Sequence, residues 1–167
     1  MTQQMFYFTR LTLSDKITTI SYVILTGILT YFFLQINSDS SNRTLLIFYT
    51  LGTQLSLYLL YYVSLRNMSV FVIWILFSFG HLYLYYQLKD NPGLQNFRGH
   101  AATGLRNLII SLFLFQLLRY ISLKTQGMEL VAPNRGGRTD LYEGRKITVV
   151  DFVLFLVYFG ITIYLNI

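Results

Sequence analysis

Five long stretches of apolar residues, almost free of charge, limit most strongly how this chain can fold. They run over residues 17–36, 44–65, 69–88, 104–123 and 147–167. A helix needs about 20 such residues to cross the ~30 Å hydrocarbon core of a bilayer. Only 12% of the residues are charged and the mean hydropathy is +0.49, whereas about a quarter of the residues of a soluble domain are charged. We therefore predict an all-α transmembrane bundle of five spanning helices, forming one membrane domain over residues 1–167.

The fourth stretch carries two charged side chains, Arg106 and Arg119. One alternative is a helix that lies in the membrane interface. We favour a spanning helix, because the long arginine stems can extend toward the two headgroup layers and shorten the required apolar centre.

The positions of the basic residues predict the orientation. With five spans, one side of the membrane receives nine basic residues: Arg10, Lys16, Arg66, Arg119, Lys124, Arg135, Arg138, Arg145 and Lys146. The other side receives four: Arg43, Lys89, Arg98 and Arg106. Since positive charge marks the cytoplasmic side, we expect a cytoplasmic N-terminus and an external C-terminus, in a bacterial cytoplasmic membrane or an organelle inner membrane. The net charge of +6 forms no concentrated patch, so no nucleic-acid partner is expected.

Two opposite charges are expected at the same depth in the bilayer. Asp151 lies four residues into the last stretch, and Arg119 lies four residues before the end of the fourth. At 1.5 Å per residue, both lie roughly 6 Å from the cytoplasmic boundary. We predict an intramembrane ion pair between Arg119 and Asp151; the alternative is that each side chain reaches the headgroups separately.

A second set of polar residues is expected nearer mid-bilayer, formed by Gln54, His81 and Gln116. Interhelical hydrogen bonds from such side chains stabilise helix packing by about 0.6–2 kcal/mol each. A proton or ion relay through His81 is the functional alternative. Because a relay needs a chain of titratable groups, we interpret this polar layer as structural.

Enzymatic constellations are not found in the sequence. The chain has no cysteine and only two histidines, which excludes thiolate chemistry and a three-histidine zinc site. We therefore expect no catalytic residues, no metal and no cofactor.

The longest polar stretch, residues 124–146, is expected as a cytoplasmic loop. It contains Arg135, Arg138, Arg145 and Lys146. One interpretation is a solvated connection that only helps to set the orientation. The functional interpretation is a contact surface for another membrane protein subunit or for anionic lipid headgroups.

The residues that lead into the last stretch resemble those of a known transporter component. Arg138-Thr139, Tyr142, Lys146-Ile147-Thr148 and Asp151 are similar to the approach to the last helix in T subunits of energy-coupling-factor vitamin transporters. The resemblance is confined to this short region. The coupling helices with Ala-Arg-Gly motifs of those subunits are missing here, so no family and no site follow from it.

The sequence thus favours a small, non-catalytic accessory or assembly subunit that lies in the lipid bilayer and packs against other membrane proteins. The alternative is a transport protein, either a channel or the membrane subunit of a transporter, that uses the intramembrane polar residues.

Overall fold

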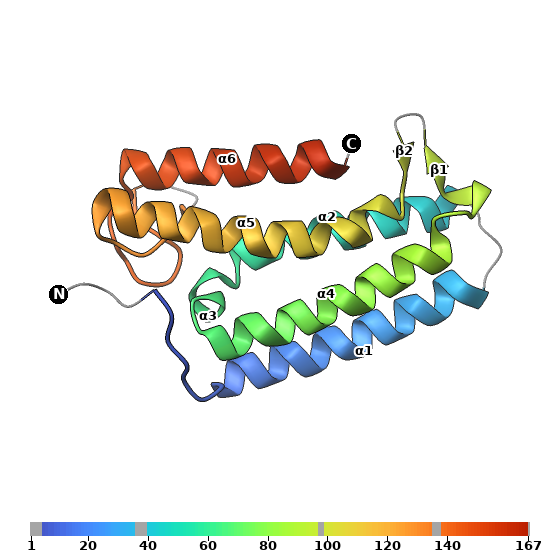
Figure 1. The fold of residues 1–167 in the computed structure, drawn as a ribbon, viewed down its shortest axis with the longest axis horizontal. Helices are drawn as coiled ribbons and strands as arrows, with labels where there is room; N and C mark the ends of the chain where they lie inside the picture. Colours follow the sequence, from blue (N-terminus) through green and yellow to red (C-terminus); the bar gives the residue numbers. More distant parts are fainter. Residues whose placement is uncertain (1–4, 36–39, 97–98, 135–137, 167) are drawn as a thin grey trace.

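The computed structural model describes residues 5–166 except 36–39, 97–98 and 135–137, and it is built almost entirely of helices. The long helices are α1 (Leu13–Gln35), α2 (Ser40–Leu59), α4 (Met68–Leu88), α5 (Thr103–Gln126) and α6 (Val149–Asn166). Successive long helices run in opposite directions along one axis (Figure 1). The all-α prediction is therefore confirmed.

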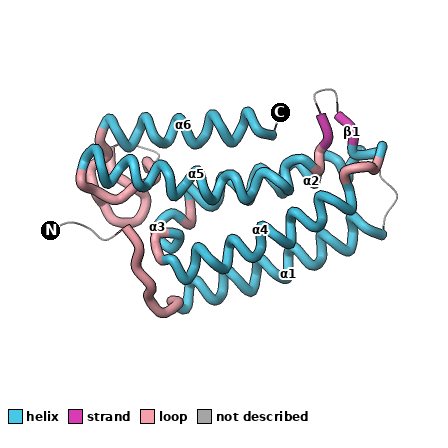
Figure 2. Tube along the Cα trace, viewed as in Figure 1, coloured by secondary structure: helices cyan, strands magenta, loops and turns pink. Residues whose placement is uncertain are grey.

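The two ends of the bundle differ in character. One end carries the short helix α3 (Tyr62–Leu65), the N-terminal segment and the loop from Gly127 to Thr148. The other end carries the 3₁₀ turn η1 (Pro92–Leu94) and the antiparallel strands β1 (Gln95–Asn96) and β2 (Gly99–His100). Figure 2 shows the loops gathered at the first end, which we call the loop end, and the strands at the second, which we call the hairpin end.

Local sequence explains where several helices begin and end. Thr12 and Asp15 form a capping box at the start of α1: the Thr12 amide donates to the Asp15 carboxylate at 2.9 Å, and the Asp15 amide donates to Thr12 Oγ1 at 3.1 Å. The helix α5 ends at Gly127, whose φ of 65° is accessible to glycine at little cost. The predicted stretch 44–65 is not one helix, because the amides of Leu60 and Tyr61 both donate to the carbonyl of Ser56 and interrupt the α-helical ladder.

Within the part of the chain that the structure describes, four helices are long and apolar enough to cross a membrane: Leu13–Leu34, Met68–Leu88, Thr103–Gln126 and Val149–Asn166. This finding supports a location in a membrane. The helix α2 is not among the four, since serine, threonine, asparagine and glutamine make up much of its length.

The helices are buried to very different extents. The helix α5 packs against α2, α4 and α6, and 44% of its span is buried, whereas only 11% of the α1 span is buried. The core forms two clusters, one around Tyr58, Phe115 and Leu154 toward the loop end and one around Leu46 and Leu105 toward the hairpin end. Most side chains of α1 are therefore free to face lipid or another molecule.

Candidate functional site

Charged side chains gather at the loop end and form a network that we call the polar cap: Arg66, Arg119, Glu129, Asp140, Glu143, Arg145 and Asp151. Four of the seven acidic residues of the chain belong to it. Arg119, Arg66, Asp140 and Asp151 are each at most 5% exposed. Because isolated buried charges are costly, the arrangement of their partners decides what this region can do.

The centre of the polar cap is a bidentate pair between Arg119 and Glu129. Nε and Nη2 of Arg119 each donate to the Glu129 carboxylate at 2.7 Å, and Nη1 donates to the carbonyl of Arg66 at 3.1 Å. The ring of Tyr7 lies 5.6 Å from the Arg119 guanidinium carbon, a cation–π distance. These contacts enclose Arg119 completely.

A second bidentate pair fixes the turn between α3 and α4. Arg66 donates to both carboxylate oxygens of Glu143 at 2.7 and 3.0 Å, and to the carbonyl of Leu130 at 2.8 Å. The side-chain amide of Gln116 donates to the carbonyl of Leu65 at 3.0 Å. Gln116 and Arg119 thus bond the carbonyls of Leu65 and Arg66, where the chain reverses and helical partners are lost.

Asp140 organises the loop itself. It accepts hydrogen bonds from the Tyr62 hydroxyl at 2.6 Å and from the amides of Tyr142, Glu143 and Arg145. Burial alone would raise the pKa of Asp140, but these four donors together outweigh it and hold the pKa below its usual value. A carboxylate bonded in this way keeps its charge and holds the loop in one conformation.

Asp151 is the first-turn acid of α6 and belongs to a capping box. The Thr148 amide donates to its carboxylate at 3.0 Å, and its own amide donates to Thr148 Oγ1 at 3.1 Å. Its remaining oxygen accepts from Arg145 Nη2 and from Gln126, both at 2.8 Å. Asp151 is therefore satisfied by its neighbours in the polar cap.

The predicted pairing of Arg119 with Asp151 is replaced by two other pairs. Arg119 binds Glu129, and Asp151 binds Arg145. The two sites are linked indirectly, because Arg145 Nη2 also donates to the carbonyl of Glu129 at 3.1 Å. The physical reason is that the loop folds back on the helix ends and brings its own charges to them, so neither residue needs the other or the headgroups.

The basic residues expected in the loop have different environments. Arg145 is only partly exposed and is bound within the polar cap, whereas Arg138 and Lys146 are exposed. Arg135 lies outside the described residues.

The expected polar layer is divided among three places. Gln116 belongs to the loop end, as described above. His81, on α4, shares its Nε2 with the hydroxyls of Tyr22 at 2.8 Å and Tyr49 at 2.9 Å, which join it to α1 and α2. No hydrogen bond joins His81 to Gln54 or Gln116 among the bonds that the described residues make.

Gln54, on α2, lies toward the hairpin end, where its side chain contacts α5 and α6. Its amide donates to the carbonyl of Gly104 at 2.9 Å, and its oxygen accepts from Ser111 at 3.1 Å and from Asn166 at 2.8 Å. The backbone of Gly104 comes so close to Thr50 and Asn166 that a Cβ atom there would overlap both side chains. Gln54 therefore holds three helices together at a close approach.

Several residues of the polar cap were missed by sequence reasoning, namely Arg66, Glu129, Asp140 and Glu143. For Asp151, which was predicted, the sequence held a signal of its actual role: Thr148 and Asp151 match the capping-box spacing at the start of an apolar run. Glu129 offered none, because its role depends on how the loop folds.

Known proteins provide no guide to this site. Comparison of the chain with protein-family models, with curated protein sequences and with solved structures finds no match. The chemistry of the site therefore has to be argued from its geometry. That geometry is one of carboxylates and guanidinium groups that pair with one another, although the Nε–H groups of Arg66 and Arg145 have no hydrogen-bond acceptor among the described residues.

Proposed function

We propose that this protein is a non-catalytic integral-membrane accessory or assembly subunit, which binds another membrane protein through the outer face of its ordered loop. The observation that carries the proposal is the contrast between the two sides of that loop. Its inner side is fixed by the polar cap. On its outer side we select four exposed residues and call them the contact face: Arg138, Leu141, Tyr142 and Lys146. Glu143 is exposed beside them, but its carboxylate is paired with Arg66.

The composition of the contact face suggests the partner. Tyr142 is 56% exposed although its ring stacks on Tyr62 with centroids 5.7 Å apart, so it is held in position while it is open to solvent. A rigid aromatic side chain loses little entropy on binding. Flanked by Arg138 and Lys146, it suits an acidic protein surface with an apolar pocket.

The topology that accompanies this proposal has five spans, including α2. The helix α2 packs against both α5 and α6, and its buried polar side chains, Thr50 and Gln54, bond inside the bundle. A helix in the interior of a bundle can be less apolar than one that faces lipid. With the excess of basic residues at the loop end, the contact face lies in the cytoplasm or its organelle equivalent.

Transport is the weaker interpretation of the same residues. Arg119 and Asp151 are bound within the polar cap, and Gln54, His81 and Gln116 bond at three separate places. A pathway for an ion needs polar groups that follow one another across the membrane, and these do not.

The test is co-purification of the full-length chain, tagged and expressed at native abundance, in a mild detergent. The double variant Arg138→Glu with Lys146→Glu should reduce the recovered partner about tenfold or more, the effect of losing ~1.4 kcal/mol of binding free energy. The matched control is Lys89→Glu with Arg106→Glu, two exposed basic residues at the hairpin end, which should leave recovery unchanged.

Two results would contradict the proposal. One is a monodisperse monomer with no co-purifying protein in the wild type. The other is an equal loss of partner in the contact-face and control variants. If the contact-face variant changes only the amount of anionic lipid retained, the face binds headgroups and the partner subunit is excluded.

A further inference from the structure

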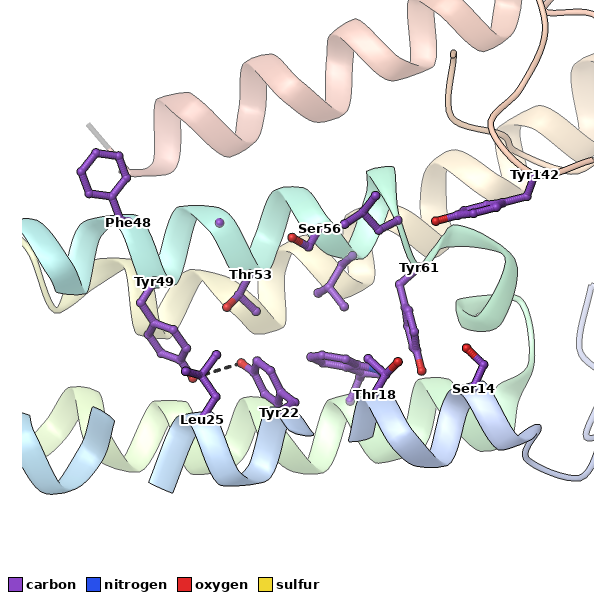
Figure 3. A pocket seen from close by; sticks show the side chains of 14 residues that line it. Ser14, Thr18, Tyr22, Leu25, Phe48, Tyr49, Thr53, Ser56, Tyr61 and Tyr142 are labelled. Atoms are coloured by element: carbon purple, nitrogen blue, oxygen red, sulfur yellow. Dashed lines mark hydrogen bonds between the residues drawn. The ribbon is translucent and has the colours of Figure 1, made fainter. Parts of the chain in front are cut away.

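A long groove separates α1 from α2 and opens sideways from the bundle. It has a volume of about 550 Å³ and reaches from Ser14 to Leu25 on α1 and from Phe48 to Leu57 on α2, with Leu60 and Tyr61 just beyond the end of α2. Figure 3 shows Thr18 and Tyr22 on α1 facing Thr53 and Ser56 on α2, with Tyr142 of the loop at one end. A sideways opening between two spanning helices faces the bilayer interior, so a membrane component is the natural occupant.

The shape of the groove decides what kind of molecule fits. Leu25 lies eleven residues beyond Ser14, or about 17 Å along the helix, which is close to the ~15 Å hydrocarbon depth of one leaflet. Spread over this length, the volume of about 550 Å³ gives a cross-section of ~30 Å². A helix is about 10–12 Å across and does not fit, whereas a single hydrocarbon chain does.

The lining of the groove is uncharged along the residues that the structure describes. Serine and threonine hydroxyls lie along it, together with several aromatic rings and the small Gly52. The occupant therefore carries no charge within the groove, although it can accept hydrogen bonds there.

One buried donor next to the groove has no acceptor. Trp74 is 3% exposed, and its indole Nε1–H has no partner among the described residues. Trp74 lies six residues into α4, or about 9 Å along the helix from its start at the loop end, and Thr18 lies at a similar distance along α1. A buried indole N–H normally finds an acceptor, and an ester carbonyl at the headgroup end of a lipid chain supplies one.

We propose that this groove binds one acyl chain of a membrane glycerolipid. The chain lies along α1 and α2 from the loop end toward Leu25 and Phe48, with its ester carbonyl near Trp74 and the hydroxyl of Thr18. The lipid fills the space that the loosely packed α1 leaves open. It also holds this helix at its distance from α2.

Trp74 is the only tryptophan of the chain, so its fluorescence reports on this place alone. The purified full-length protein in detergent is titrated with a phosphatidylcholine whose acyl chains carry bromine, which quenches indole fluorescence at short range. We expect saturable quenching that ends at one lipid per protein.

The decisive test is a variant in which a larger side chain fills the groove. A Cβ atom on Gly52 meets nothing within 4 Å, so Gly52→Leu extends into the groove without disturbing the fold, which circular dichroism checks. It should weaken lipid binding about tenfold or more. The matched control is Gly160→Leu on the exposed face of α6, where a Cβ atom also meets nothing within 4 Å, and it should bind as the wild type does.

The proposal is overturned if quenching rises without saturation, which is the behaviour of surrounding bulk lipid. It is also overturned if Gly52→Leu and Gly160→Leu quench equally. If an isoprenoid quinone displaces the brominated lipid at a concentration lower than that of the lipid, the groove binds a quinone through its ring carbonyl, and the assignment to an acyl ester is wrong.

Discussion

Removing the negative charge of Glu129 tests whether the polar cap stabilises the fold. Glu129→Gln keeps the size of the side chain but leaves the Arg119 guanidinium, which is fully buried, without its charge partner. One of the two hydrogen bonds at 2.7 Å also loses its acceptor, since the amide nitrogen cannot accept.

The magnitude follows from the burial of this pair. Breaking a buried ion pair from one side costs about 3–5 kcal/mol, because an uncompensated charge is left behind. The Glu129 side chain is 15% exposed, and the amide of the substituted side chain keeps one oxygen acceptor, so we expect the lower end, about 3 kcal/mol. Arg66 adds to the loss, since its Nε lies 3.8 Å from the Glu129 carboxylate.

The assay is reversible unfolding in mixed micelles with an increasing fraction of denaturing detergent, followed by circular dichroism and Trp74 fluorescence. The double variant Arg119→Met with Glu129→Leu removes both charges. It should cost about 1–3 kcal/mol, less than the single variant, because the carbonyl of Arg66 and Gln116 Oε1 each lose a donor, while Arg66 keeps Glu143 as its charge partner.

Asp90→Asn is the control, since this carboxylate lies 4.0 Å from Lys89 Nζ in an exposed pair and should change the free energy of unfolding by less than ~0.5 kcal/mol. The reasoning is refuted if Glu129→Gln costs no more than this control. It is equally refuted if the double variant costs as much as Arg119→Met and Glu129→Leu, measured separately, added together.

Three further changes test other parts of the structure. The depressed pKa of Asp140 stabilises the fold at pH values above the unfolded pKa of about 3.9, and this contribution is lost as the pH falls through the lower folded pKa. The pH dependence of the free energy of unfolding should therefore be weaker in Asp140→Asn than in the wild type. An unchanged pH dependence would exclude this role of Asp140. Gly104→Ala should cost about 1–3 kcal/mol through overlap with Thr50, and Thr50→Ala, which removes the hydroxyl oxygen closest to that Cβ position, should relieve part of the overlap. Gly27→Ala, where a Cβ atom meets nothing within 4 Å, is the control in the same unfolding assay. Thr148→Ala should cost about 1 kcal/mol by removing the cap of α6, and a loss no greater than that of a surface threonine would show that the cap is dispensable.

The presence of helices long and apolar enough to cross a membrane could be predicted from the sequence alone. Hydropathy is a property of a local stretch of residues, so the runs that make up most of α1, α4, α5 and α6 could be recognised without knowledge of the fold. The capping box at Thr148 and Asp151 was equally legible, because its partners are three residues apart. The interruption of the second run after Leu59 could not be predicted, since apolar composition does not indicate where a helix ends.

The choice of partners was decided only by the tertiary structure. Arg119 and Asp151 were expected at one depth, yet depth alone does not distinguish Asp151 from Glu129 as the partner of Arg119. The loop settles this by folding over the helix ends, with Asp140 fixing its conformation through Tyr62. Charges that lie far apart in the sequence are brought together because burying an unpaired charge costs too much free energy. The sequence alone does not indicate which of the possible pairs will form.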